Sequence, residues 1–433
     1  MNIKAFASRR KQLMRMMGED SIAILPAAPV LIRNRDVEHG YRQDSDFYYL
    51  SGFEEPEAVI VLIPGRKQGQ YVMFCRERDR VKETWNGYRY GPEGVVESFD
   101  VDEAYPIDDL EEILPGLMEH CESVYYTIGV HPEFDKKVMS CVNSLRKQSR
   151  GGKHAPYEFV ALDYLLHDMR LFKSREEISL MRKAAKISVQ AHIDAMKLCE
   201  PGLNEYQLEA EILYRFNKNG AGWAYSSIVG SGANSCILHY TENNKPLEDG
   251  ALVLIDAGSE YQGYASDITR TFPVNGQYSA AQKEIYDLVL EAQNAAIAQV
   301  KPGNHWNDPH NAAVKVLTKG MVELGLLKGK PAQLIKEGAY TNYYMHRTGH
   351  WIGMDVHDVG DYKVDDEWRL LEPGMVLTVE PGLYIPAGSR GAKRWWNIGV
   401  RIEDDIAVTK DGNDMLTKGL PRTTAEVEAV MAS

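Results

Sequence analysis

The first 172 residues alternate short apolar runs with stretches of helical spacing. The runs are rich in β-branched and aromatic residues, and the helical stretches lie near residues 108–120 and 133–147. Short strands that alternate with helices predict an α/β domain over residues 1–172. The four apolar runs are SIAILPA, AVIVLIP, QYVMFC and SVYYTIG.

Residues 173–433 combine long helical stretches with apolar runs that lead to acidic residues. A helix is expected from Ser174 to about Cys199, because Ser174 and Glu177 have the spacing of a capping box. Apolar segments lie between the predicted helices, so we expect an α+β domain with outer helices and a curved, largely antiparallel sheet. The capping arrangement recurs at Asn204 with Gln207 and at Ser279 with Gln282.

Four acidic residues accompany the apolar runs of this second domain. Two of them bracket a glycine-rich turn after the run LVLI, and the other two follow the runs MVLTV and IGVRI. Gathered without cations, four carboxylates would repel one another and stay partly protonated, so their convergence requires positive charge among them. In chain order the acids are Asp256, Asp267, Glu380 and Glu403.

One histidine belongs with these acids. His350 is flanked by Gly349 and Gly353, a setting that indicates close backbone approach rather than a helix interior. Four carboxylates and one imidazole suit two divalent metal ions. Such oxygen-rich ligation favours Mn²⁺, although cobalt, iron or zinc can also enter. For any single acid taken alone, a solvated strand end is the competing interpretation.

The order of these features repeats along the chain. Residues 198–256 and 300–380 each contain a Pro-Gly turn, a helix, a histidine, a second glycine turn and an apolar run that closes on an acid. Duplicated halves packed face to face would form an internal pseudo-twofold with the metal site near its axis. Chance recurrence of Pro-Gly pairs is the alternative explanation.

Composition restricts the class of protein. The 49 basic and 62 acidic side chains give a net charge of −13 without a basic stripe, which argues against a nucleic-acid partner. No apolar stretch approaches the roughly 20 residues needed to cross a bilayer, and scattered basic residues interrupt any signal-peptide core near the N-terminus. The five cysteines show no close pairing, so reduced thiols in a cytoplasmic protein are expected.

Five segments within residues 174–410 resemble the pita-bread metallopeptidase domain, specifically that of aminopeptidase P. They are HYTENN, DAGSEYQGYASDITRTF, GHWIGMDVHD, EPGMVLTVEPGLY and GVRIEDD. The N-terminal segment RNRDVEHGYRQDSDFYYLSGF resembles the N-terminal domain of the same family. The resemblance implies that Asp267 and Glu403 bridge both metals, that Asp256 binds one metal, and that His350 and Glu380 bind the other.

The resemblance also implies an activity, namely release of the N-terminal residue from peptides with proline in the second position. The reaction would proceed through a hydroxide that bridges the two metals. Glu380 is the candidate to take the proton from water and pass it to the leaving amine. His239 and His357 are candidates for binding the substrate carbonyl and stabilising the intermediate, and His346 for the proline-side pocket. A hydrogen-bonded core position is the alternative for each histidine.

Three further residues match positions near the family's site. Arg401 shares a strand face with Glu403, so its guanidinium can orient a carboxylate ligand, and the Tyr384 hydroxyl is a candidate to do likewise. Trp85 matches an aromatic residue that reaches a neighbouring subunit's site, with core packing as the alternative. The family implies a homodimer or homotetramer. Arg347 departs from the family pattern, in which a small residue is expected at this place.

Two other functions stay open from the sequence. An Xaa-Pro dipeptidase would use the same metals but would cap the pocket beyond proline with a fixed arginine. Arg369, Arg390 and Arg394 lie in loops that could supply it. A non-enzymatic interaction protein on this fold would have a degraded ligand set, whereas all five ligand positions are intact.

Overall fold

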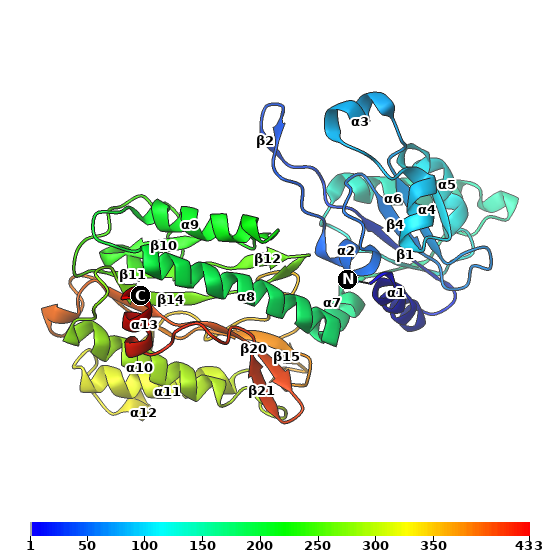
Figure 1. Ribbon diagram of the computed structural model, residues 1–433. Coiled ribbons are helices and arrows are strands. Elements are labelled where there is room, and N and C mark those ends of the chain that lie inside the picture. Colours follow the sequence, from blue (N-terminus) through cyan, green and yellow to red (C-terminus); the bar gives the residue numbers. More distant parts are fainter. Residues whose placement is uncertain (1) are drawn as a thin grey trace. The chain divides into compact units, whose positions relative to one another are not determined.

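The computed structural model describes residues 2–433, which divide into two compact units, an N-terminal unit that ends at Met169 and a C-terminal unit, Arg170–Ser433. Both units combine helices and strands (Figure 1). Among the described residues, no helix is both long and apolar enough to cross a membrane. All five cysteines are free thiols, and four of them are buried.

The N-terminal unit is built on a six-stranded sheet with the order β6-β5-β4-β1-β7-β8. β4 pairs antiparallel with β1 and β5, and the other neighbours are parallel. The four strands and two helices predicted here are confirmed, and α5 (Leu110–Met118) and α6 (Pro132–Lys147) contribute to one apolar core with the sheet. The strands are β1 (Ser21–Pro26), β4 (Val59–Leu62), β5 (Tyr71–Cys75), β6 (Glu103–Pro106), β7 (Ser123–Tyr125) and β8 (Glu158–Val160).

Smaller elements complete this unit. The β2–β3 hairpin is antiparallel. The helix α7 ends just inside the C-terminal unit. The elements are α1 (Ile3–Met17), β2 (Ile32–Asn34), β3 (Val37–Glu38), α2 (Ser45–Ser51), α3 (Arg80–Asn86), α4 (Gly91–Phe99), η1 (Ile107–Asp109), η2 (Ser149–Gly151) and α7 (Asp163–Leu171).

The C-terminal unit contains two pairs of long helices. The pairs are α8 with α9 and α10 with α11, and strands lie between the two pairs in Figure 1. The three predicted capping boxes are present at the starts of α8, α9 and α10. The helices are α8 (Arg175–Leu198), α9 (Glu205–Lys218), α10 (Ala280–Ile297), α11 (Asp308–Glu323), α12 (Pro331–Lys336) and α13 (Thr424–Met431), with short 3-10 turns η3 (Gly232–Cys236), η4 (Ala339–Asn342) and η5 (Lys393–Trp395).

The strands of the C-terminal unit form five small sheets, and every strand pair recorded among its described residues is antiparallel. The two that position the site are β10-β11-β14 and β17-β20-β21. The strands are β9 (Gly222–Trp223), β10 (Ile228–Ser231), β11 (Leu252–Asp256), β12 (Ser259–Tyr261), β13 (Tyr264–Ala265), β14 (Thr269–Pro273), β15 (Lys363–Val364), β16 (Glu367–Trp368), β17 (Val376–Val379), β18 (Gly382–Ile385), β19 (Ile398–Arg401), β20 (Asp404–Thr409) and β21 (Gly412–Met415).

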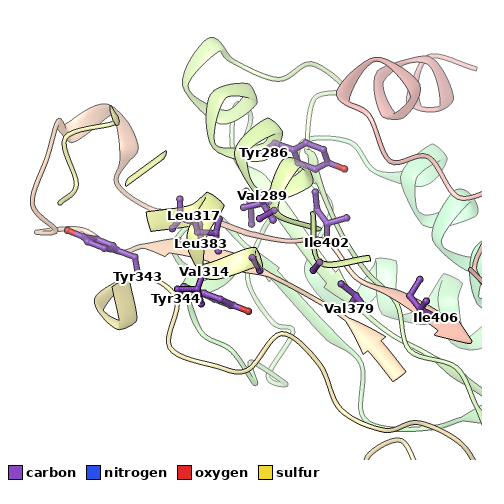
Figure 2. Packing of buried hydrophobic residues seen from close by; sticks show 14 of the residues in the cluster. Tyr286, Val289, Val314, Leu317, Tyr343, Tyr344, Val379, Leu383, Ile402 and Ile406 are labelled. Atoms are coloured by element: carbon purple, nitrogen blue, oxygen red, sulfur yellow. The ribbon is translucent and has the colours of Figure 1, made fainter. Parts of the chain in front are cut away.

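Each helix pair packs its apolar face on one of these strand groups. Side chains of α8 and α9 form a core with β10, β11 and β14, and side chains of α10 and α11 form a second core with β17 to β20. Figure 2 shows part of the second core, to which the helices contribute Val289 and Leu317 and the strands contribute Val379, Leu383 and Ile406. Full burial of such a side chain contributes about 1.5–3 kcal/mol, so the strand ends are held firmly.

Candidate metal centre and active site

The four predicted acids lie at the ends of two antiparallel strand pairs. Antiparallel pairing places the end of one strand beside the start of its partner, so each pair presents two acids at one edge. The pairs are β11 with β14 and β17 with β20. Asp256 ends β11, Asp267 precedes β14 by two residues, Glu380 directly follows β17 and Glu403 directly precedes β20.

Hydrogen bonds join the two strand pairs where the acids lie. The Glu403 N–H donates to the Thr269 carbonyl at 3.1 Å, and the Asp267 N–H donates to Asp405 Oδ2 at 3.1 Å. The Thr269 hydroxyl also donates to Glu403 Oε2 at 2.6 Å. Residues that are more than 130 positions apart in the chain are thereby held beside one another.

A pocket of about 1040 Å³ in the C-terminal unit opens at this junction. The structure therefore brings the five predicted ligands to one place, together with most of the other predicted site residues. The ligand candidates on its wall are Asp256, Asp267, His350, Glu380 and Glu403, and the other predicted residues there are His239, His346, His357 and Arg401.

His350 reaches the acids because its segment lies alongside β17. The Glu380 N–H donates to the Thr348 carbonyl at 2.8 Å, and the Thr378 N–H donates to the His350 carbonyl at 2.9 Å. A Cβ atom on Gly349 would lie 2.0 Å from the Thr378 carbonyl oxygen, so the predicted close backbone approach is confirmed. The His350 Nε2 atom lies 3.4 Å from Asp267 Oδ2 and 3.7 Å from Glu380 Oε1.

The electrostatics of the cluster fit a site for cations. Burial, together with neighbouring acids, raises the pKa of Asp267, Glu380 and Glu403, and that of Glu380 reaches about 7. Burial alone would lower the pKa of His350, but Asp267 and Glu380 raise it to about 9. Carboxylates that lie this close together repel one another, and such an arrangement is typical of residues that bind divalent cations.

Two geometric observations agree with this interpretation. One ligand atom each from Asp267, His350 and Glu403 lies within 4.8 Å of the others. Glu403 Oε1 is buried and has no hydrogen-bond partner among residues 2–433. A buried carboxylate oxygen without a donor is costly unless a cation coordinates it, so the residues present fit divalent metal ions.

The other predicted histidines lie around the acids. The His357 ring centroid is 4.3 Å from that of His350. His346 Nε2 lies 2.8 Å from the Tyr384 hydroxyl, and His346 Nδ1 lies 3.8 Å from Glu380 Oε2. Burial, together with the Arg401 charge, lowers the pKa of His346 to about 3, so this imidazole is neutral at physiological pH.

Comparison with known proteins identifies the family. The family model of metallopeptidase family M24 matches residues 179–410, and that of the aminopeptidase P N-terminal domain matches residues 6–125. The chain belongs to metallopeptidase family M24. The M24 protein is 46% identical over 430 residues to the Xaa-Pro aminopeptidase of Escherichia coli (strain K12), which covers 99% of this chain and 97% of that relative.

Solved structures are similar to this M24 metallopeptidase over its whole length. Aminopeptidase PepP of Pseudomonas aeruginosa has a TM-score of 0.99 and 58% identity, covering 100% of this chain and 98% of that one. A glutamate-to-alanine variant of Escherichia coli aminopeptidase P in complex with substrate has a TM-score of 0.97 and 45% identity, with the same coverage. The chain is therefore a hydrolase of the metallopeptidase class with the two-domain fold of aminopeptidase P.

Within the M24 site, Arg401 contacts a different acid from the one nearest in sequence. Arg401 Nη2 donates to Asp256 Oδ2 at 2.6 Å, whereas its Nε reaches Glu403 only through the Thr269 hydroxyl, at 3.1 Å. Arg401 Nη1 donates to the Tyr384 hydroxyl at 3.1 Å. The Tyr384 hydroxyl is thus hydrogen-bonded to Arg401 and His346, rather than to the carboxylate that the sequence predicted.

Tyr225 is a site residue that the sequence analysis missed. Its hydroxyl lies 2.6 Å from Asp256 Oδ1 and 2.5 Å from Asp267 Oδ1. One hydroxyl proton can serve only one of two carboxylates at a time, so Tyr225 fixes the separation of these acids without neutralising both. A tyrosine shortly before a strand has no sequence signal that distinguishes it from a packing residue.

A Tyr225→Phe variant is expected to keep the fold and to bind metal about 10–100-fold more weakly, the usual effect of losing a residue that orients metal ligands. The reason is that Asp256 and Asp267 lose the hydroxyl that spaces them. Calorimetric titration of metal into the protein, after a chelator has removed its metal, measures the change in metal affinity. Tyr214→Phe, at an exposed position on α9, is the matched control. Unchanged metal affinity would exclude an orienting role for Tyr225.

Trp85 lies in the N-terminal unit, on α3, and its side chain is 83% exposed. The alternative of core packing is therefore wrong.

The arginines expected to cap a dipeptide pocket are not among the described residues that line the pocket with the five ligand candidates. Arg369 lies over the Phe172 ring, Arg390 lines a separate pocket and Arg394 lies over the Trp395 ring.

Proposed function

We propose that this M24 metallopeptidase is an Xaa-Pro aminopeptidase, which releases the N-terminal residue from peptides whose second residue is proline. One observation carries the proposal. Five metal-ligand candidates, Asp256, Asp267, His350, Glu380 and Glu403, converge in a single pocket. They do so in a chain that matches Xaa-Pro aminopeptidases over nearly its whole length.

Two divalent cations, most favourably Mn²⁺, would be held by these five side chains. Asp267 and Glu403 would hold both cations, Asp256 would hold one of them, and His350 and Glu380 would hold the other. When bound, the cations supply Lewis acidity that lowers the pKa of water and balances negative charge on the substrate.

Glu380 is proposed to move the proton. Its Oε1 faces His350 at 3.7 Å, and its Oε2 lies toward His346 at 3.8 Å, so the two oxygens point to different neighbours. The nitrogen of an Xaa-Pro bond carries no hydrogen and must be protonated as it leaves. Glu380 would accept a proton from the attacking water and deliver it to that nitrogen.

The remaining polar residues are proposed to hold the substrate and the ligands. His239 and His357 line the pocket and would donate hydrogen bonds to the substrate carbonyl oxygen, where negative charge develops. Arg401 would position Asp256 through their contact at 2.6 Å. Tyr384 and His346, which share a hydrogen bond of 2.8 Å, would shape the proline side.

The activity is tested with a peptide that has proline in the second position and a control peptide that has alanine there. We expect the proline peptide to be cleaved faster, and we expect chelation to abolish cleavage and added Mn²⁺ to restore it. Equal turnover of both peptides, or turnover that survives exhaustive chelation, would end the proposal. Parallel titrations with Mn²⁺, Co²⁺ and Zn²⁺ identify the preferred metal.

A Glu380→Gln variant is expected to lower kcat by about 10²–10⁴-fold, the usual contribution of a positioned proton-transfer group, with a much smaller change in KM. The amide can still ligate a cation through its oxygen but cannot accept the proton. Steady-state kinetics and elemental analysis of bound metal separate the two roles. Glu323→Gln, at an exposed position near the end of α11, is the control. A variant with wild-type kcat would remove Glu380 from proton transfer.

The dipeptidase alternative is not favoured, because the matched relatives are aminopeptidases and the three arginines suggested as a cap do not line the pocket. Comparing Xaa-Pro dipeptides with longer Xaa-Pro peptides tests it directly. The intact ligand set likewise argues against a non-enzymatic interaction protein.

The finer features implied by the resemblance remain proposals. The C-terminal unit has two helix pairs and two strand pairs, and each strand pair presents two acids. This duplication supports a curved pita-bread sheet with an internal pseudo-twofold. We retain domains at 1–172 and 173–433, a homodimer or homotetramer in which Trp85 reaches the neighbouring site, and a cytoplasmic location as predictions.

A further inference from the structure

One wall of the pocket carries basic side chains that the proposed chemistry does not use. Arg347 and Lys363 both line the pocket, together with Trp368. The Arg347 guanidinium lies 5.0 Å from the centroid of the Trp368 ring, and Lys363 Nζ lies 4.9 Å from the same centroid. Two cations therefore flank a single indole, and cation–π attraction holds both charged groups at this wall.

Neither cation has an acidic partner in the structure. Arg347 donates to the side-chain oxygen of Asn307, and no ion pair of Arg347 or Lys363 occurs within residues 2–433. Asp361 also lines this wall without pairing to either cation. Basic groups held in a pocket without a counter-ion are available to an anionic ligand.

Backbone contacts position the part of the wall that carries Lys363 and Trp368. Lys363 and Trp368 are partners in the register of the β15–β16 hairpin, so they share one face, whereas Glu367 pairs with Val364 on the other face. His305 Nδ1 lies 2.7 Å from the Trp368 carbonyl oxygen. The backbone beneath Lys363 and Trp368 is therefore already ordered, and a ligand has to order only the long basic side chains.

The distribution of charge in the pocket orients a peptide. An aminopeptidase substrate carries a positive amine on the residue before the scissile bond, and the cations held by the acids would cancel the negative charge of the cluster. The basic wall has no such compensation and repels the amine, so the part of the peptide beyond proline extends toward this wall. His346, the residue next to Arg347, lies 3.8 Å from Glu380 Oε2, so the wall begins directly beside the acids.

We infer that Arg347, assisted by Lys363, binds a carboxylate that the substrate carries beyond its proline. The inference rests on the proposed aminopeptidase function and specifies its substrates. Two sources can present this chemistry, the α-carboxylate of a tripeptide or an acidic side chain at the third position. Arg347 is thereby a specificity-determining residue.

The source is identified with two peptide pairs. One pair is an Xaa-Pro-Ala tripeptide with a free carboxylate and its C-terminal amide. The other is a pair of amidated Xaa-Pro pentapeptides with glutamate or glutamine at the third position. We expect kcat/KM to favour the carboxylate-bearing member of at least one pair by about tenfold, chiefly through KM, as one charge-assisted contact would give.

Variants assign the preference to the wall. Arg347→Gln is expected to reduce the preference for the carboxylate-bearing peptide to about twofold or less. Glutamine is still a polar hydrogen-bond donor, but it lacks the positive charge and the bidentate guanidinium geometry. Lys363→Gln is expected to reduce it by a smaller factor. Arg390→Gln is the matched control, because Arg390 lines a separate pocket of the same unit. Raising the salt concentration should weaken the preference in the wild type.

A binding measurement keeps the inference independent of turnover. Calorimetry compares the affinities of the product-like dipeptide Pro-Ala and its amide for the metal-loaded protein and for both variants. Tighter binding of the acid that disappears in Arg347→Gln supports the inference even if no peptide is cleaved, in which case only the proposed function fails. The absence of any carboxylate preference in kinetics and binding, or a preference that survives in Arg347→Gln, overturns it.

Discussion

An Asp267→Asn variant is expected to lose about a thousandfold in kcat/KM and to retain less metal than the wild type. Asparagine has nearly the shape of aspartate but carries no charge and offers one ligating oxygen instead of two. A thousandfold corresponds to about 4 kcal/mol of lost transition-state stabilisation, which is the scale of metal-ion catalysis. Steady-state kinetics and elemental analysis measure the two effects.

The stability of the metal-free variant separates loss of a ligand from damage to the fold. Burial and the neighbouring Asp256 raise the pKa of Asp267, so its charge is unfavourable without cations. The metal-free variant should therefore melt at the same temperature as the wild type or higher, and added metal should stabilise it less. Asp287→Asn, at an exposed position on α10, is the control. Lower metal-free stability with full metal content would contradict the assignment.

The second large effect is expected from Asp404→Ala, which should lower the free energy of unfolding of the C-terminal unit by about 3–5 kcal/mol. Arg270 Nη2 and Asp404 Oδ1 are 2.8 Å apart, and both side chains are fully buried. Arg270 Nη1 also donates to the Glu403 carbonyl at 2.6 Å, so the pair helps to join the two strand groups. Removing the acid leaves a buried guanidinium without its counter-charge.

Urea denaturation followed by tryptophan fluorescence measures this loss, because Trp85 is the single tryptophan outside the C-terminal unit. The matched control is Asp414→Ala, which breaks an ion pair with Arg182 whose side chains are 35% and 28% exposed. Solvent screens that pair, so its loss should cost less than about 1 kcal/mol. Equal effects of the two variants would show that burial of the Arg270–Asp404 pair carries no special weight.

The metal-ligand candidates were predictable because the signals that locate them are local. An apolar run of four or five residues predicts a buried strand, and an acid at its end has a defined position. The glycines beside His350 indicated the close approach that Gly349 makes to Thr378. Strand pairing then brings the acids together two by two, and the hydrogen bonds between the two strand pairs, which the sequence does not predict, complete the cluster.

The residues that support the acids were less predictable, because their contacts cross between strands that are distant in sequence. Arg401 ends β19 two residues before Glu403, yet its direct partner is Asp256 on β11. Strand periodicity predicts the face of the sheet on which a side chain lies, but it does not predict which acid of another strand contacts that side chain. Tyr225 spans two acids through a loop position that carries no periodicity at all.

The basic residues around the pocket were predicted least well. Arg369, Arg390 and Arg394 were the candidates, whereas Arg347 and Lys363 line the pocket with Arg401. Where a long basic side chain points depends on loop conformation and on a packing partner, here the indole of Trp368. Neither follows from the spacing of residues along the chain.

The assembly of the site from two distant strand pairs ties cation binding to the folding equilibrium. Asp256 and Glu403 are 147 positions apart in the chain, so they are not held close together in the denatured state. A cation therefore has no comparable cage before the chain folds, and each bound ion draws the population toward the native state by mass action, about 2.7 kcal/mol at a hundred times its dissociation constant. Metal supply should thus set the cellular lifetime of the polypeptide as well as its turnover number.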